Sequence, residues 1–264
     1  MDLGFIGTGA IVEAMVTGLL QAPSPDLSVL LSPRNAETAA RLAERFPEQV
    51  RIAASNQAVV DGSMLVVLAV RPQIAADVLP ALQFRADHHV LSLIATVSAE
   101  KIADMVAPAT KITRAVPLPS MALGAGPTIV IPPDAVVTGL FGRAGVAIEV
   151  ADEHAYAALT ASSAIMAAHF AAAQTIVDWL SGQGIPAEDG RRYIGQVFSG
   201  LAKTADLHAE MSFGALSVDH KTVGGINEQI EANLAEAGAY KALTAALDGV
   251  YARLRGVKLA SNDA

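Results

Sequence analysis

The first twenty residues of the chain constrain its fold more than any other segment. They read MDLGFIGTGAIVEAMVTGLL, in which an apolar run at residues 3–6 leads into glycines at positions 7 and 9 and then into a helical pattern. A strand that passes through a glycine turn directly into a helix is typical of the first unit of a doubly wound α/β sheet. The chain is therefore predicted to begin with a Rossmann-like domain.

The glycine turn is also predicted to bind a dinucleotide. Gly7 permits the tight turn, and the missing side chain of Gly9 lets a pyrophosphate approach the backbone, where the amides and dipole of the helix favour negative charge. The third glycine of the usual fingerprint is replaced by Val12, so the prediction depends on the strand before the turn and the helix after it. The predicted binding residues here are Gly7, Thr8, Gly9, Ala10 and Ile11.

Short apolar runs and helical patterns alternate through the first half of the chain. We expect strands at residues 3–6, 27–31, 64–69, 89–93, 111–116, 127–131 and 146–150, and helices at 10–21, 36–45, 75–82 and 98–105. Strand and helix in alternation predict a parallel sheet covered on both faces. This pattern assigns residues 1–152 to a coenzyme-binding Rossmann domain.

The second half of the chain has a different pattern. From residue 153 onward we find no strand signal, only alanine-rich helical stretches with breaks at residues 181–186 and 223–225. Residues 153–264 are therefore predicted to form an all-α domain that takes part in dimerisation and substrate binding. Because this domain has more apolar residues than a small helical unit usually buries, we expect a homodimer formed through its helices, with a higher oligomer as the alternative.

Composition excludes several classes of protein. The chain has no cysteine, so it has no disulfide or thiolate chemistry, and its six histidines show no metal-binding spacing. A net charge of −8 disfavours nucleic acid as a partner. We find neither a signal peptide nor an uninterrupted apolar stretch of about 18 residues, so we expect a cytoplasmic protein without a membrane partner.

The end of the second predicted strand indicates which dinucleotide binds. An acidic residue at this point would accept hydrogen bonds from a free ribose 2′-hydroxyl. The chain instead has Ser32, Arg34 and Asn35, whose hydroxyl, guanidinium and amide suit a 2′-phosphate. NADP(H) is therefore predicted in preference to NAD(H). The alternative for Arg34 is an ordinary solvated loop charge.

Several segments, in order and over nearly the whole chain, resemble the pyrroline-5-carboxylate reductase family. Beside the opening turn and the 32–35 loop, LAVRPQ at residues 68–73 resembles the family's AVKPQ segment, and RAVP at 114–117 resembles its RxMPN segment. SLIATVS at 92–98 resembles the strand end between them. The resemblance implies further coenzyme contacts from Asn56, Ala69, Val70, Arg71, Pro72 and Ala95. Arg114 is interpreted as a ligand-binding residue at a strand end, with an ordinary surface charge as the alternative.

The family's SPGGTT loop, whose following helix binds the substrate carboxylate, is matched here by residues 222–227, TVGGIN. The resemblance implies that Thr222 or Asn227 orients the substrate nitrogen as a catalytic residue. It also implies substrate contacts from Gly224, Gly225, Ile226 and Leu118. Two glycines followed by a helix start also form an anion-receiving geometry on physical grounds. The alternative is a plain glycine-bearing helix junction capped by Asn227.

Three substrate-side segments depart from the family pattern. Leu118 replaces an asparagine, residues 222–227 keep only the two glycines, and residues 160–165 lack both glycines and the proline of the family's SGSGPA turn. A pocket with leucine in place of asparagine should accept a more apolar group. The substrate is therefore expected to be pyrroline-5-carboxylate, the precursor in proline biosynthesis, or a related cyclic imine.

Two other functions stay open at the level of the sequence. One is a reductase like the β-hydroxyacid dehydrogenases, although residues 160–174 contain no lysine where those enzymes carry a catalytic one. For a ketone substrate, Lys221 or His220 would be the nearest proton donor. The other is an NADP-binding protein without catalytic activity. Such a protein would have lost its substrate site and would sense the coenzyme or a partner, whereas the enzyme would bind a small-molecule substrate.

Overall fold

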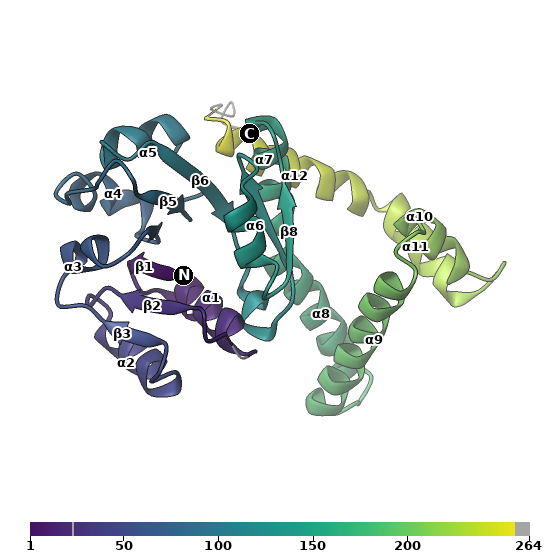
Figure 1. Ribbon diagram of the computed structural model, residues 1–264. Helices are drawn as coiled ribbons and strands as arrows, with labels where there is room; N and C mark the ends of the chain where they lie inside the picture. Colours follow the sequence, from purple (N-terminus) through teal and green to yellow (C-terminus); the bar gives the residue numbers. More distant parts are fainter. Residues whose placement is uncertain (23, 257–264) are drawn as a thin grey trace. The chain divides into compact units, whose positions relative to one another are not determined.

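A computed structural model describes residues 1–22 and 24–256 of the chain (Figure 1). The chain divides into two compact units, residues 1–160 and residues 161–264. The sequence places the boundary at residue 152, just before helix α7 (Glu153–Ser163). Most of α7 groups with the sheet instead, because Tyr156 and Leu159 pack against Ile129 and Ile131 of the sheet.

The first unit contains an eight-stranded sheet in the order β3-β2-β1-β4-β5-β6-β7-β8. This confirms the predicted Rossmann-like α/β fold, because β1 to β6 pair in parallel and the order reverses direction between β1 and β4. The strands are β1 (Asp2–Ile6), β2 (Ser28–Leu31), β3 (Val50–Ile52), β4 (Leu65–Leu68), β5 (His89–Ser92), β6 (Lys111–Val116), β7 (Pro127–Ile131) and β8 (Val146–Glu149).

Strand β7 departs from the expected parallel sheet, since it runs antiparallel to β6. The link between the two strands holds only a short 3-10 helix, η1 (Pro119–Leu123), which ends at Gly124 in the left-handed region with φ +68°. A parallel pairing needs a crossover of a dozen or more residues, usually with an α-helix. A connection this short returns the chain beside β6 in the opposite direction.

Helices cover both faces of the sheet. Side chains of α1, α2 and α6 join one apolar core that includes Phe5, Met15 and Phe141, whereas those of α3, α4 and α5 join the core on the opposite face around Ile6 and Leu68. Consecutive strand residues are thus buried on alternate faces, as in parallel sheets generally. The helices are α1 (Ala10–Leu20), α2 (Ala36–Arg45), α3 (Asn56–Asp61), α4 (Pro72–Val78), α5 (Ala99–Val106) and α6 (Ala135–Phe141).

The second unit is entirely helical over residues 161–256, as predicted. Its breaks at residues 183–186 and 220–225 lie where the glycines indicate them, while the breaks at 208–212 and 237–238 were not expected. The helices that follow α7 are α8 (Ile165–Gly182), α9 (Ala187–Leu207), α10 (Phe213–Asp219), α11 (Ile226–Glu236) and α12 (Ala239–Leu254).

The helical unit buries very little of its own surface. Over residues 161–256, the buried positions are Ala161, Val177 and Gly190. Large apolar side chains such as Phe170 and Trp179 are 72% and 62% exposed. By length and composition, the stretch 153–182 could cross a membrane, although polar residues interrupt it; core helices of water-soluble proteins pass the same test, so a single such stretch is weak evidence.

Candidate functional site

The carboxyl edge of the sheet brings together the segments that the sequence assigns to the coenzyme. Gly7, Ser32 and Ala69 directly follow β1, β2 and β4, three strands that lie side by side. The Ser32 amide donates to the Phe5 carbonyl at 3.0 Å, and the Ala69 amide donates to the Ile6 carbonyl at 2.9 Å. Ligands of open α/β sheets bind at this edge, where the strand order reverses.

Gly7 forms the turn that the sequence predicts. Its φ is +100°, and a Cβ atom there would lie 2.7 Å from the Ala69 carbonyl oxygen. Its amide donates to the Ser32 hydroxyl at 2.9 Å. A side chain at this position would therefore be strained by the backbone angle and would also collide with the neighbouring strand end.

Gly9 leaves room for a ligand at the start of α1. It is the N-cap residue, it makes no side-chain capping bond, and a Cβ atom there would meet nothing within 4 Å. The first amides of α1, at Ala10 and Ile11, have no acceptor within the helix. Open space beside these amides fits the pyrophosphate of a dinucleotide.

The predicted 2′-phosphate loop separates into two parts. Ser32 is fully buried, and its hydroxyl contacts the Gly7 amide and Thr8 Oγ1, which lies 3.2 Å away. Thr8 also donates to the Ser32 carbonyl at 3.0 Å. Ser32 therefore shapes the turn, while Arg34 and Asn35 are exposed and Asn35 makes no side-chain capping bond to α2. These two side chains present the donors of the loop.

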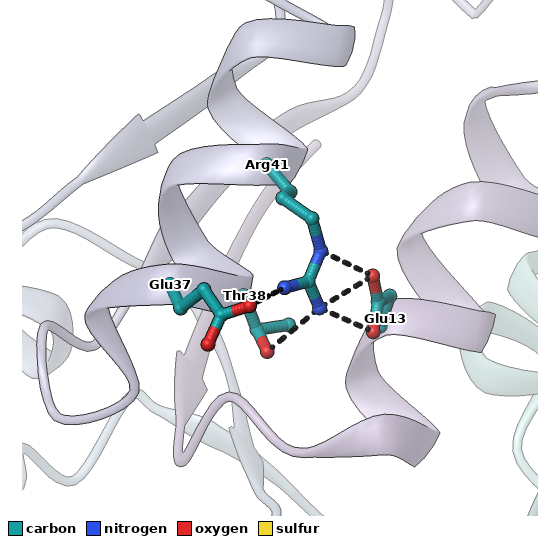
Figure 2. Close-up of polar contacts among 4 residues, drawn as sticks. All are labelled: Glu13, Glu37, Thr38 and Arg41. Atoms are coloured by element: carbon teal, nitrogen blue, oxygen red, sulfur yellow. Dashed lines mark hydrogen bonds and ion pairs between the residues drawn. The ribbon is translucent and has the colours of Figure 1, made fainter.

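An ion-pair cluster joins α1, which follows β1, to α2, which begins directly after this loop (Figure 2). The Arg41 guanidinium contacts Glu13 at 3.1 Å and Glu37 at 2.8 Å, and it donates to Thr38 Oγ1 at 3.2 Å. Sequence reasoning did not single out this cluster, because its residues lie apart along the chain. Arg41 is occupied by carboxylates, whereas the exposed Arg34 forms no ion pair among the described residues and stays open to a phosphate.

The other residues that the sequence assigns to the coenzyme also follow strands of the sheet. Ala69 is half-buried and Val70 is buried, whereas Arg71 is exposed as the N-cap residue of α4, with Pro72 as the first residue of that helix. Asn56 starts α3 and is half-buried, as is Ala95 in the segment after β5.

Leu118 lies beyond the end of β6 as the N-cap residue of η1, and it is half-buried. Its leucine side chain offers no hydrogen bond to a ligand. Any contact it makes with a ligand is therefore apolar.

Arg114 serves the fold rather than presenting a charge at the strand end. It is 3% exposed, it forms an ion pair with Glu153, and its guanidinium lies 4.5 Å from the centre of the Tyr156 ring. It also donates to the Val97 carbonyl at 3.3 Å. These contacts hold α7 against the sheet.

The loop between α10 and α11 is braced by its own side chains. The Asn227 amide donates to the His220 carbonyl at 2.8 Å, so this predicted catalytic residue supports the loop. Gly224 has φ +72°, and a Cβ atom on Gly225 would lie 2.3 Å from Thr222 Oγ1. Both glycines are thus required by the turn. Thr222, Val223 and Ile226 are exposed.

Two glutamates of α11 that the sequence did not assign to the site contact this loop. Glu228 Oε2 accepts a hydrogen bond from the Gly224 amide at 2.7 Å, and Glu231 Oε2 lies 3.3 Å from Lys221 Nζ. The signal that could have found Glu228 is its place as the third residue of α11, where a glutamate commonly reaches back to the backbone before the helix.

A cavity of about 710 Å³ lies beside this loop, within the helical unit. Phe198, Leu216 and Phe213 contribute apolar surface, and Asn227 and Lys221 line it from the loop. Its size is in the range of small-molecule sites.

Comparison with known proteins gives matches to both halves of the chain. The family described as "NADP oxidoreductase coenzyme F420-dependent" matches residues 2–96. The pyrroline-5-carboxylate reductase of Haemophilus influenzae is 25% identical over 234 residues, which cover 84% of this chain and 85% of that protein.

Solved structures of similar fold cover nearly the whole chain. The 1-pyrroline-5-carboxylate reductase of Streptococcus pyogenes has a TM-score of 0.83 at 20% identity, covering 97% of this chain and 98% of that one. The Plasmodium falciparum pyrroline carboxylate reductase with NADP bound has a TM-score of 0.81 at 18% identity, with coverage of 97% and 98%. The fold is thus shared over both units.

Proposed function

We propose that this chain, which belongs to the pyrroline-5-carboxylate reductase family, reduces the C=N bond of a cyclic imine with a nicotinamide coenzyme. The observation that carries the proposal is the β1–α1 turn. Gly7 is fixed there by its backbone angle and by Ala69, while Gly9 leaves open space beside unpaired helix amides. Such a turn at the carboxyl edge of a parallel sheet supports dinucleotide binding.

NADPH is the coenzyme that the loop after β2 favours. Arg34 and Asn35 are exposed donors at that position, and no carboxylate is available between residues 32 and 35 to bind a free 2′-hydroxyl. A guanidinium forms charge-assisted hydrogen bonds with phosphate, which supports a preference for NADPH over NADH. The solved relative from Plasmodium falciparum has NADP bound.

The proposed reaction requires little acid–base catalysis from the protein. When bound, NADPH supplies a hydride, and a protonated cyclic imine is already electrophilic at carbon. The chain has to position the ring and exclude water. Thr222 has an exposed hydroxyl suited to orienting the imine nitrogen, while Asn227 holds the loop through the His220 carbonyl. Leu118 would provide an apolar contact.

The finer identity of the substrate is part of the proposal. Pyrroline-5-carboxylate, whose reduction gives proline, is the substrate named for the relatives, and a related imine is the alternative. Leu118 and the exposed Val223 and Ile226 favour a ring with apolar surroundings.

We also propose that the helical unit dimerises. A unit of nearly one hundred residues that buries Val177 and few other side chains has no core of its own. A second copy of the chain would cover apolar side chains such as Phe170 and Trp179, which are exposed in the single chain. We therefore propose that a second copy of the chain, and not a membrane, covers the apolar stretch 153–182. This proposal also agrees with a cytoplasmic location.

The test is oxidation of NADPH by the purified protein with pyrroline-5-carboxylate, piperideine or bulkier cyclic imines. Turnover of any of these imines supports the proposal. Turnover of β-hydroxyacids instead would favour the dehydrogenase alternative. Tight NADPH binding without turnover of any imine would favour a protein that binds the coenzyme without catalysis.

A further inference from the structure

Both groups of the 220–225 loop that would attract an anion already hold a carboxylate of the chain itself. The Gly224 amide donates to Glu228 Oε2 at 2.7 Å. The Lys221 ammonium lies 3.3 Å from Glu231 Oε2. These are two separate contacts, made to two side chains one turn apart on α11. Neither the amide nor the ammonium is therefore left open for the carboxylate of a substrate.

The first of these contacts also changes the charge at the start of α11. The unpaired amides and the dipole of a helix N-terminus correspond to about half a positive charge. Glu228 is the third residue of this helix of 11 residues and places a full negative charge beside it. A substrate carboxylate would have to displace Glu228 or lie against it, and like charges placed together at a binding surface repel each other.

The cavity beside the loop also lacks an open positive charge for a carboxylate among its described lining residues. Its lysine and its glutamate, Lys221 and Glu231, form an ion pair with each other. Aromatic and aliphatic side chains such as Phe198 and Leu216 supply much of the remaining lining. Such surroundings suit an uncharged ring, and the carboxylate of Glu228 nearby suits a protonated imine.

We propose that Glu228 is a specificity-determining residue that directs the enzyme toward cyclic imines without a carboxylate group. The inference rests on the proposed function and names its substrate class. In the reaction, the imine carbon gains a hydride from NADPH, which is oxidised to NADP⁺. The π electrons of the C=N bond become the nitrogen lone pair, and the resulting secondary amine takes a proton from water.

A pair of substrates that differ only in the carboxylate tests this inference. We would measure kcat/KM with NADPH for 1-pyrroline and for pyrroline-5-carboxylate, using the full-length protein. The unmodified chain should prefer 1-pyrroline by at least about tenfold, which corresponds to about 1.4 kcal/mol of discrimination.

Two variants separate the charge of Glu228 from its hydrogen bond. Glu228→Gln keeps an oxygen that can accept from the Gly224 amide but removes the negative charge, and Glu228→Ala removes both. Glu228→Gln should lower the preference for 1-pyrroline about tenfold, and Glu228→Ala should lower it further. In both variants the change should come mainly from a lower KM for pyrroline-5-carboxylate. The matched control is Glu236→Gln, an exposed glutamate at the other end of α11, which should leave the preference unchanged.

The outcomes distinguish this inference from the proposed function. A preference of the unmodified chain for pyrroline-5-carboxylate, or a loss of activity on it in Glu228→Gln, would overturn the role of Glu228 while leaving imine reduction intact. If none of the proteins turns over either imine although NADPH binds, imine reduction itself is wrong and the inference fails with it. The expected shift in Glu228→Gln, absent in Glu236→Gln, supports both.

Discussion

Gly7 and Gly9 are only two positions apart, yet Gly7 is needed for the stability of the turn and Gly9 for the space that the coenzyme would occupy. Gly7→Ala would place a Cβ atom 2.7 Å from the Ala69 carbonyl at φ +100°, so it should lower the free energy of unfolding by about 1–3 kcal/mol. Gly9→Ala meets no protein atom within 4 Å and should keep the stability of the parent chain. Its methyl group would instead enter the space of the pyrophosphate and weaken NADPH binding by about tenfold.

Urea unfolding and titration of NADPH by fluorescence measure these two effects separately. A Gly9→Ala variant that binds NADPH with unchanged affinity would contradict the placement of the pyrophosphate at the start of α1. A Gly7→Ala variant as stable as the parent would contradict the strained turn.

Arg34 is expected to decide between the two nicotinamide coenzymes. Arg34→Ala removes an exposed guanidinium from the loop after β2 and should weaken NADPH binding by about tenfold, the loss of one charge-assisted hydrogen bond. Binding of NADH, which has no 2′-phosphate, should stay the same. The control is Arg45→Ala, in the last turn of α2 and thus far from the helix start. Equal losses for the two coenzymes would show that Arg34 does not contact the 2′-phosphate.

At the scale of elements, α7 is attached to the sheet by a cluster that contains an unpartnered hydroxyl. Tyr156 is 3% exposed, and its hydroxyl has no hydrogen-bond partner among the described residues. A buried polar group without a partner destabilises the folded state. Tyr156→Phe should therefore keep or raise the free energy of unfolding at neutral pH, by up to about 1 kcal/mol. A clear loss of stability would show that the hydroxyl has a role in the fold.

The raised pKa of Tyr156 predicts how the free energy of unfolding changes at alkaline pH. Burial raises the pKa of Tyr156 from 10.0 to about 12, because the ionised form loses its water. The unfolded chain therefore loses this proton at lower pH than the folded chain, and the stability contribution present below pH 10 is lost as the pH rises toward 12. Urea unfolding across this range should show a smaller decline in Tyr156→Phe than in the parent chain.

Local patterns in the sequence predict most elements of the sheet unit, including β6 and α2 at their observed bounds. They miss β3, which has three residues at the sheet edge, and the helices α3 and α6, which have six and seven residues. Elements this short contain too few residues to show a period. The direction of β7 was also missed, because the side chains of a strand do not encode its orientation relative to a neighbour.

In the candidate site, too, the sequence predicts local features better than contacts between distant residues. The positions of Gly7 and Gly9 follow from a local turn and could be read directly. The burial of Ser32 and the ion pair of Arg114 with Glu153 depend on residues distant in sequence, so the sequence revealed neither of them. Glu228 lies only four residues from Gly224, and its place as the third residue of α11 is a local signal for the hydrogen bond to that amide, which our sequence analysis did not use.

At the scale of the whole molecule, the two units differ in how they are stabilised. The sheet unit has a large apolar core on each face, and the two cores contain fully buried side chains such as Phe5 and Leu68. The helical unit leaves Phe213 and Leu207 about four-fifths exposed. Apolar surface contributes to stability only when it is removed from water, at about 25 cal/mol per Å². This difference is the reason why we propose that the helices are stabilised by a second chain.

The oligomeric state in solution tests this argument. Light scattering should give a mass of at least twice the 27.2 kDa of one chain at micromolar concentration. Phe170→Asp puts a charge on an exposed apolar position of α8 and should shift the equilibrium toward monomer, whereas Gln183→Asp, at the exposed end of that helix, should not. Trp179, the one tryptophan of the chain, gives a second measurement: in the dimer its emission should be at shorter wavelength, and it should move to longer wavelength on dilution or in Phe170→Asp. A parent chain of 27.2 kDa at every concentration, with Trp179 emitting as in water, would mean that the helical unit is stable without a partner.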